Sequence, residues 1–189
     1  HSTSNAGNRI ADVHGGLEGD TELRFADTCD LASIDVLLLC SAHGESRKWL
    51  EANDVPAGVK IIDLAQDFRD ESDGFVYGLP ELNRDRIRTA ERVANPGCFA
   101  TAIQLALLPL AAAGLLTGEV HVTAVTGSTG AGVKPSATTH FSWRTDNISV
   151  YKAFTHQHLI EIGRNLRRLQ PVAMRLEVKD GIHDSILVD

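Results

Sequence analysis

Two short, uninterrupted apolar runs with a helix-like segment between them place the strongest constraint on the fold. The runs are "IDVLLLC" (34–40) and "VKIIDL" (59–64), and "ESRKWLEA" (45–52) separates them. Continuous apolar runs of this length are typical of strands buried on both faces, and the segment between them has the composition of a short helix. Strand, loop, helix and strand in this order predict an open parallel α/β sheet.

The rest of the chain continues this alternation. We expect a turn and a short helix within 77–87, a brief strand at 92–94, and a helix from Cys98 to about Ala113 that ends at Gly114. Further strands are predicted at 120–126, 147–154 and 172–179, and an amphipathic helix at 156–170. A second unit of mixed helices and strands is therefore expected after the parallel sheet.

Three predicted loops leave the carboxyl ends of predicted strands: 40–44, 65–69 and 95–98. Because the carboxyl ends of parallel strands meet at one edge, we expect these loops to share a rim. Ligands of open α/β sheets bind outside this edge. The sequence therefore predicts a functional site where the three loops meet.

The composition excludes several other kinds of protein. The net charge of −7 argues against a nucleic-acid surface, and no apolar run has the length of a membrane span. Three irregularly spaced cysteines, Cys29, Cys40 and Cys98, suggest neither a disulfide framework nor a zinc site. No signal-peptide pattern opens the sequence. We expect a soluble cytoplasmic protein without a metal.

Cys98 stands at the start of the predicted helix, after "NPG" (95–97). The unpaired N–H groups and partial positive charge of a helix start favour a thiolate, and the same N–H groups can hold an oxyanion. A free cysteine is also among the most frequently buried and inert residues. The residues alone leave both interpretations open.

Other polar residues near the predicted rim have a functional and a structural interpretation. His156 and His158 begin a predicted helix, where one could partner a nucleophilic thiol, although surface histidine pairs are common there. Arg69 could hold a substrate anion or simply be a solvated loop arginine. "TGSTGAG" (126–132) is not the dinucleotide fingerprint, but its N–H groups could line a phosphate or ribose.

Together these segments resemble the N-acetyl-gamma-glutamyl-phosphate reductase family of arginine biosynthesis, in its Bacteroidetes-type version. The segments that carry the resemblance are "VANPGCFATAIQLALLP" (93–109), "IIDLAQDFR" (61–69), "YGLPELNR" (77–84), "TGSTGAGVKPSATTHFSWRTDNISVYKAF" (126–154) and "HQHLIE" (156–161). Gln66 replaces the alanine usual in the second of them. Several separate motifs in the right order are far more specific than any one of them.

The resemblance implies an α/β fold of two domains. Residues 1–98 are expected to form a Rossmann-like dinucleotide-binding domain that lacks its first strand and glycine-rich turn. Residues 99–189 are expected to form an incomplete α+β catalytic and dimerisation domain, as in glyceraldehyde-3-phosphate dehydrogenase. The resemblance covers residues 1 to about 170, and 171–189 do not follow the family's pattern. We therefore expect an incomplete chain.

The resemblance also implies a reaction and the residues that perform it. Cys98 would form a thioester with the γ-acyl group of the phosphorylated substrate, and His156 would be the general acid/base. Arg69, His158 and Glu161 would bind the substrate. NADPH would be the cofactor, with these residues around it: Ser2, Thr3, Ser4, Ser41, Ala42, His43, Gly127, Ser128, Thr129, Gly130, Ala131 and Gly132.

The expected partners are N-acyl-gamma-glutamyl phosphate, inorganic phosphate, and further copies of the chain in a dimer or tetramer. The acyl group stays open between acetyl, succinyl and a carrier protein. Two alternatives to this function also stay open. One is an aspartate-semialdehyde dehydrogenase-type enzyme, which shares the chemistry, and the other is a truncated, non-catalytic binding module of the same fold.

Overall fold

The computed structural model describes the chain except for residues 3, 133, 135, 172 and 182–189. Its first sheet has four strands in the order β1-β2-β4-β3, and every pairing is parallel. The strands are β1 (Val36–Leu39), β2 (Lys60–Asp63), β3 (Val76–Tyr77) and β4 (Arg92–Ala94). The helices α2 (Glu45–Ala52) and α3 (Pro80–Thr89) connect them. The predicted open parallel sheet is confirmed.

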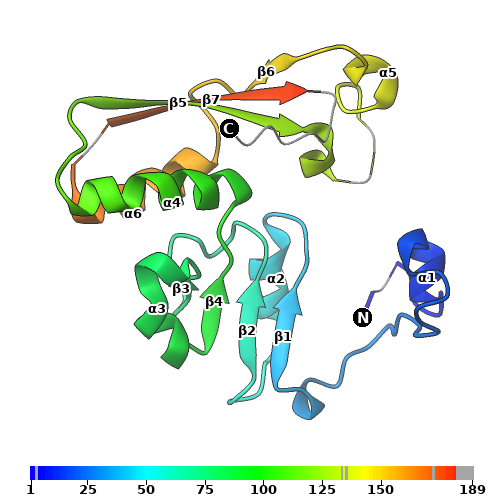
Figure 1. Cartoon of the computed structure of the whole chain (residues 1–189). Helices are drawn as coiled ribbons and strands as arrows, with labels where there is room; N and C mark the ends of the chain where they lie inside the picture. The colour runs from blue at the N-terminus through cyan, green and yellow to red at the C-terminus, as the bar shows by residue number, and fades with distance from the viewer. Residues whose placement is uncertain (3, 133, 135, 172, 182–189) are drawn as a thin grey trace.

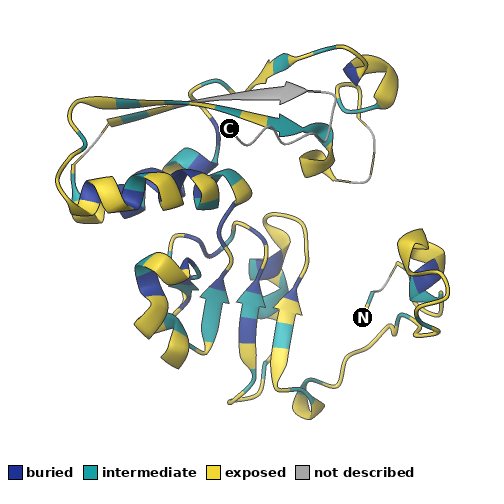
Figure 2. Cartoon of the chain, viewed as in Figure 1, coloured by how far each residue is buried: buried dark blue, intermediate teal, exposed yellow. Residues whose placement is uncertain are grey.

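One prediction for this sheet is wrong: β1 is not buried on both faces. Leu39 lies in a core cluster with Ile61, and Trp49 of α2 packs against that cluster. Val36 and Leu38 point to the opposite face and are 43% and 56% exposed. The helix covers one face of this edge strand only, so a continuous apolar run has produced a strand that is buried on one side (Figure 2).

The second unit begins with α4 (Cys98–Ala112), which packs against α6 (His158–Leu169). Both helices lie against a second sheet in the order β5-β7-β6 (Figure 1). In this sheet β5 (Glu119–Gly127) pairs in parallel with β7 (Ala173–Gly181), and β6 (Ser149–Tyr151) pairs antiparallel with β7. The helices and strands predicted for this half are confirmed.

Backbone conformation explains where one helix and one strand of this unit end. Gly114 has a φ of +69° and its N–H donates to the carbonyl of Ala111, so the residue ends α4 as predicted. The strand predicted at 147–154 is shorter, because Lys152 and Phe154 have φ values of +45° and +57° and leave the extended conformation.

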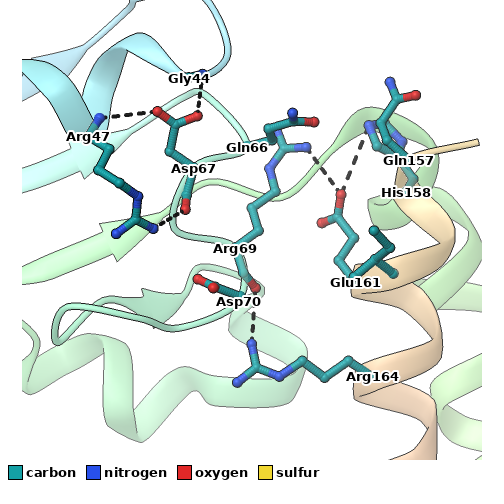
Figure 3. Close-up of a pocket in the computed structure, with 11 residues that line it drawn as sticks. Gly44, Arg47, Gln66, Asp67, Arg69, Asp70, Gln157, His158, Glu161 and Arg164 are labelled. Carbon is teal, nitrogen blue, oxygen red and sulfur yellow. Dashed lines mark hydrogen bonds and ion pairs between the residues drawn. The ribbon is translucent and has the colours of Figure 1, made fainter.

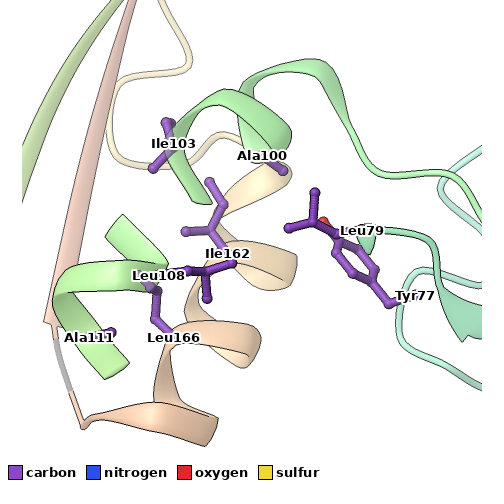
Figure 4. Close-up of a cluster of buried hydrophobic side chains, with 8 residues drawn as sticks. All are labelled: Tyr77, Leu79, Ala100, Ile103, Leu108, Ala111, Ile162 and Leu166. Atoms are coloured by element: carbon purple, nitrogen blue, oxygen red, sulfur yellow. The ribbon is translucent and has the colours of Figure 1, made fainter. Parts of the chain in front are cut away.

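The two units share one apolar core. Eight buried side chains form it (Figure 4): Tyr77, Leu79, Ala100, Ile103, Leu108, Ala111, Ile162 and Leu166. The first two come from the strand β3 and the residue before α3, and the others from α4 and α6. The carboxylate of Glu71, 6% exposed, adds ion pairs to guanidinium groups of α3 and α6. The parallel sheet is thereby held against the helices that begin at Cys98 and His158.

Five short elements complete the described chain. They are α1 (Ile10–Val13), α5 (Phe141–Arg144) and 3₁₀ turns at Gly15–Leu17, Leu31–Ser33 and Ser128–Ala131. The segment with α1 and the N-terminus lies to one side of the first sheet (Figure 1). Within the described part of the chain, no helix is long and apolar enough to cross a membrane.

Candidate active site

The three loops predicted to share a rim do meet. The N–H of Gly44 donates to Asp67 Oδ1 (2.6 Å), which joins the loop after β1 to the loop after β2. Arg69 Nε donates to the carbonyl of Asn95 (2.8 Å), which joins the loop after β2 to the turn before α4. The carboxyl ends of parallel strands have therefore built one site, as the sequence predicts.

Cys98 is the first residue of α4 and is exposed. It lines a cavity of about 300 Å³ between the first sheet, α6 and the end of β5. The interpretation of Cys98 as an inert, buried core residue is therefore excluded. The cavity also contains, among the residues that the sequence singles out, His43, Arg69, Gly127, Ser128, Gly130, Ala131, His156 and His158.

His156 and His158 lie side by side in this cavity, with ring centroids 4.6 Å apart, and are 4% and 7% exposed. The N–H of His158 donates to His156 Nδ1 (3.2 Å) at the start of α6. Because Nδ1 accepts a hydrogen bond, the proton of the neutral His156 ring is on Nε2. The other ring nitrogen of His156, Nε2, can therefore donate a hydrogen bond but has no lone pair to accept one.

Both imidazoles are neutral near pH 7. Burial lowers the pKa of His156, and the positive charge of Lys152 adds to this effect. Burial lowers the pKa of His158 to about 4, with smaller contributions from His156 and Arg69. His158 Nδ1 is buried without a hydrogen-bond partner among the described residues. A buried polar atom left in this state beside a cavity is available to a ligand.

Arg69 and Glu161, which the sequence assigns to substrate binding, form a buried ion pair. Arg69 Nη1 lies 3.1 Å from Glu161 Oε1, and the two side chains are 10% and 6% exposed. The other two guanidinium nitrogens donate to the carbonyls of Asn95 (2.8 Å) and Leu64 (3.4 Å). Every nitrogen of Arg69 is thus engaged by the protein, so its first task is to hold these segments together.

A second cavity of about 400 Å³ lies on the other side of the ion pair and shares Arg69, Gln157 and His158 with the first (Figure 3). Arg47 and Arg164 line it, but both guanidinium groups are already bound. Arg47 pairs with Asp73 and also donates to the Asp67 carbonyl, and Arg164 contacts Glu71 and the Arg69 carbonyl. This cavity is therefore lined mainly by charges that neutralise one another.

The remaining residues predicted to bind cofactor are not all brought to the cavity. Ser41, Ala42, Thr129 and Gly132 do not line it, although each is within two positions of a residue that does. Ser41 Oγ bonds Ser46 Oγ (2.6 Å). Ser2 and Ser4 lie in the N-terminal segment, where the Ser2 N–H donates to the Ala26 carbonyl. Thr3 is outside the described residues. The roles of these six described residues stay predictions.

Sequence reasoning missed the buried polar side chains behind the site. Tyr77 donates to Glu161 Oε2 (2.6 Å) and accepts from Gln104 Nε2 (2.7 Å), and Asn165 Nδ2 donates to Gln104 Oε1 (2.7 Å). Gln104 carried a signal, since it is a lone amide in the apolar run "AIQLALL". Among the described residues, no group of three His, Cys, Asp or Glu side chains could hold a metal ion.

Two family models match the chain in succession. The model for the semialdehyde dehydrogenase NAD binding domain matches residues 1–90, and the model for the semialdehyde dehydrogenase dimerisation domain matches residues 98–186. Each model covers just under half of the chain, and both are models of semialdehyde dehydrogenase domains. The second match extends beyond residue 170, where the resemblance read from the motifs ends.

The chain is similar to N-acetyl-gamma-glutamyl-phosphate reductases. It is 62% identical to that of Bacteroides thetaiotaomicron and 61% identical to that of Parabacteroides distasonis, in each case over 90% of this chain and 53% of the relative. The reductase of Flavobacterium johnsoniae is 52% identical over 90% of this chain and 54% of its own length. The chain thus spans about half the length of the curated relatives it matches.

The solved structures that resemble this fold are more distant in sequence. Aspartate semialdehyde dehydrogenase II of Vibrio cholerae, complexed with ASA, has a TM-score of 0.60 at 17% identity, over 82% of this chain and 54% of that one. The enzyme of Candida albicans with NADP has a TM-score of 0.62 at 14% identity, over 88% and 53%. At this level of identity the likeness supports the fold class alone.

Proposed function

We propose that the protein reduces an N-acyl-gamma-glutamyl phosphate to the N-acyl-glutamate semialdehyde with NADPH, a step of arginine biosynthesis. The observation that carries the proposal is the exposed Cys98 at the start of α4, in one cavity with His156. The similarity to reductases over 90% of the chain gives the substrate class.

In the proposed reaction Cys98 Sγ attacks the γ-acyl carbon. The bond from this carbon to the phosphate oxygen breaks, inorganic phosphate leaves, and a thioester joins the acyl group to Cys98. The first N–H groups of α4 lack acceptors within the helix and point toward the oxygen that gains charge. The Nε2–H of His156 is a second donor for this oxygen. Once a hydride has been added to the thioester carbon, the carbon–sulfur bond breaks, the aldehyde leaves, and Cys98 is released as the thiolate.

The cavity suits a nicotinamide beside Cys98. Its lining includes the small residues Gly127, Ser128, Gly130 and Ala131. A Cβ at Gly130 would meet only Thr126 Oγ1, at 4.0 Å, so this part of the lining is open enough for a flat ring. NADPH bound there supplies the hydride that reduces the thioester. In the proposal His43, Gly127, Ser128, Gly130 and Ala131 hold the cofactor at this end.

The reverse reaction tests the proposal most directly. We expect the protein to oxidise N-acyl-glutamate semialdehyde with NADP⁺ only when phosphate is present, and iodoacetamide to abolish this activity. NADPH absorbance is the measurement, with N-acetyl and N-succinyl substrates compared side by side. Aspartate semialdehyde is the control substrate for the related dehydrogenases. A faster reaction with aspartate semialdehyde, or no phosphate-dependent reaction in folded protein, contradicts the proposal.

The second sheet supports a proposed association with another copy of the chain. One face of this sheet packs on α4 and α6 through Val122, Ala124 and Met174, whereas Val125 lies on the other face. Val125, Ile148 and Val150 are 70%, 67% and 56% exposed. The matched family model is that of a dimerisation domain. We expect sedimentation to give at least twice the mass of one chain, and Val125→Lys to lower this mass. A single species of one-chain mass contradicts the association.

A further inference from the structure

Glu161 is held by donors from three separate parts of the chain. Its Oε2 accepts from the Tyr77 hydroxyl (2.6 Å) and from the N–H of Gly97 (3.2 Å). Its Oε1 accepts from Arg69 Nη1 (3.1 Å). Since Gly97 directly precedes Cys98, one of these bonds is made by the backbone that presents the thiol.

The turn before Cys98 is held at both ends by the same ion pair. Arg69 binds the carbonyl of Asn95, and Glu161 binds the N–H of Gly97. Pro96 stands between these two residues and has little rotational freedom of its own. The position of the Glu161 carboxylate therefore fixes the direction in which the chain enters α4, and with it the position of Cys98 Sγ.

The side chains behind Glu161 form a chain of hydrogen bonds in which each side chain donates to the next one toward the carboxylate. Asn165 donates to Gln104, Gln104 to the Tyr77 oxygen, and Tyr77 to Glu161. Tyr77, Gln104 and Asn165 are each 1% exposed or less, so water does not compete for these bonds. Burial raises the pKa of Tyr77, and the negative charge of Glu161 raises it further. The Tyr77 hydroxyl therefore keeps its proton and remains a donor. Bonds aligned in this way strengthen one another.

We propose that Tyr77 is a positioning residue for the nucleophile, acting through Glu161 on the turn that carries Cys98. Tyr77 lines neither cavity, so it acts without touching substrate. The inference rests on the proposed role of Cys98 as nucleophile. Without the hydroxyl, Glu161 Oε2 keeps only the longer bond to Gly97, and Gln104 Nε2 loses one of its two acceptors and keeps only the Ala100 carbonyl (2.9 Å).

The test compares Tyr77→Phe with the wild-type protein in a Cys29→Ser, Cys40→Ser background, since all three cysteines are exposed. We expect the second-order rate of Cys98 alkylation by iodoacetamide to fall about 10-fold, and kcat to fall about 10- to 100-fold at an unchanged KM. Displacements below 1 Å have effects of this size on a reacting group. An unchanged alkylation rate and an unchanged kcat overturn the proposal.

Ile162→Val controls for a merely structural effect. Ile162 follows Glu161 in α6 and is fully buried in the same core cluster as Tyr77, but its side chain has no hydrogen-bonding group. The variant should lower the melting temperature while leaving the Cys98 alkylation rate unchanged. An equal fall in that rate for Ile162→Val and Tyr77→Phe assigns Tyr77 to stability alone and overturns the proposal. If Tyr77→Phe does not fold, Gln104→Met removes the donor behind Tyr77 and should lower the rate in the same direction.

The alkylation rate separates this inference from the proposed function. It reports the position and ionisation of the thiol whether or not the protein reduces an acyl phosphate. A slower Cys98 in Tyr77→Phe, together with a wild-type protein that lacks turnover, would uphold the positioning role and reject the proposed reaction. Normal turnover in both the wild type and Tyr77→Phe would uphold the proposed reaction and reject the positioning role.

Discussion

Cys98→Ser is expected to lower phosphate-dependent oxidation of N-acyl-glutamate semialdehyde by on the order of 10⁴-fold or more, as when a nucleophile is removed. A serine hydroxyl ionises far less readily than a thiol, so it needs a base to accept its proton. His156 cannot be that base in its present tautomer, because Nδ1 accepts from the His158 N–H and Nε2 carries the proton. The cavity therefore suits a nucleophile that does not depend on His156 as its base.

The measurement is kcat/KM for the semialdehyde at saturating NADP⁺ and phosphate. Cys29→Ser is the matched control, because Cys29 is equally accessible but lies in the segment before β1, away from the cavity. It should retain full activity. A Cys98→Ser protein that keeps even a tenth of the wild-type rate would move the reaction away from Cys98.

Gly97→Ala is the second substitution with a large expected effect. A Cβ at this position would lie 2.4 Å from His158 Nε2 and 2.7 Å from Glu161 Oε1. The backbone itself tolerates alanine, since φ is −67°. The clash is therefore entirely with side chains, and these cannot easily move: Glu161 is bound to Arg69 and Tyr77, and His158 is buried.

Gly97→Ala should cost about 1–3 kcal/mol of unfolding free energy, as overpacking of a filled site does, and lower kcat about 10²-fold through displacement of Cys98. Denaturant melts and turnover of the same preparation measure both effects. Gly16→Ala is the control, because a Cβ there meets nothing within 4 Å and the backbone needs no positive φ. It should match the wild type in both experiments. Unaltered stability and kcat in Gly97→Ala would mean that the turn is looser than these contacts imply.

The fold could be predicted from the sequence because each of its elements has a local signal. The apolar run at 34–40, the glycine at the end of α4 and the three-and-four spacing in α6 each identify an element without knowledge of its neighbours. What the local pattern could not give was which face of a strand is covered. An apolar side chain such as Leu38 has the same appearance in the sequence whether or not a helix packs on it.

Part of the candidate site could likewise be predicted from the sequence, and part could not. Cys98 lies at the start of one helix, and His156 and His158 lie at the start of another. These positions follow from element boundaries, so the meeting of the three residues in one cavity could be anticipated. The pairing of Arg69 with Glu161 could not, because the partners are 92 residues apart in the chain. The resemblance assigned both charges to substrate binding, and the structure shows that they also bind one another. Polar groups that bind one another in the core leave no periodic pattern.

The turn that carries Cys98 depends on side chains from a loop of the parallel sheet, from β3 and from α6. Each of these residues is tolerable only in the presence of the others: Glu161 without Arg69 would be an uncompensated buried charge, and any residue larger than Gly97 would meet His158. Substitutions here should therefore arise together or not at all during divergence. Transplanting the "NPGC" turn into another scaffold would likewise require all three supporting segments, not the four residues alone.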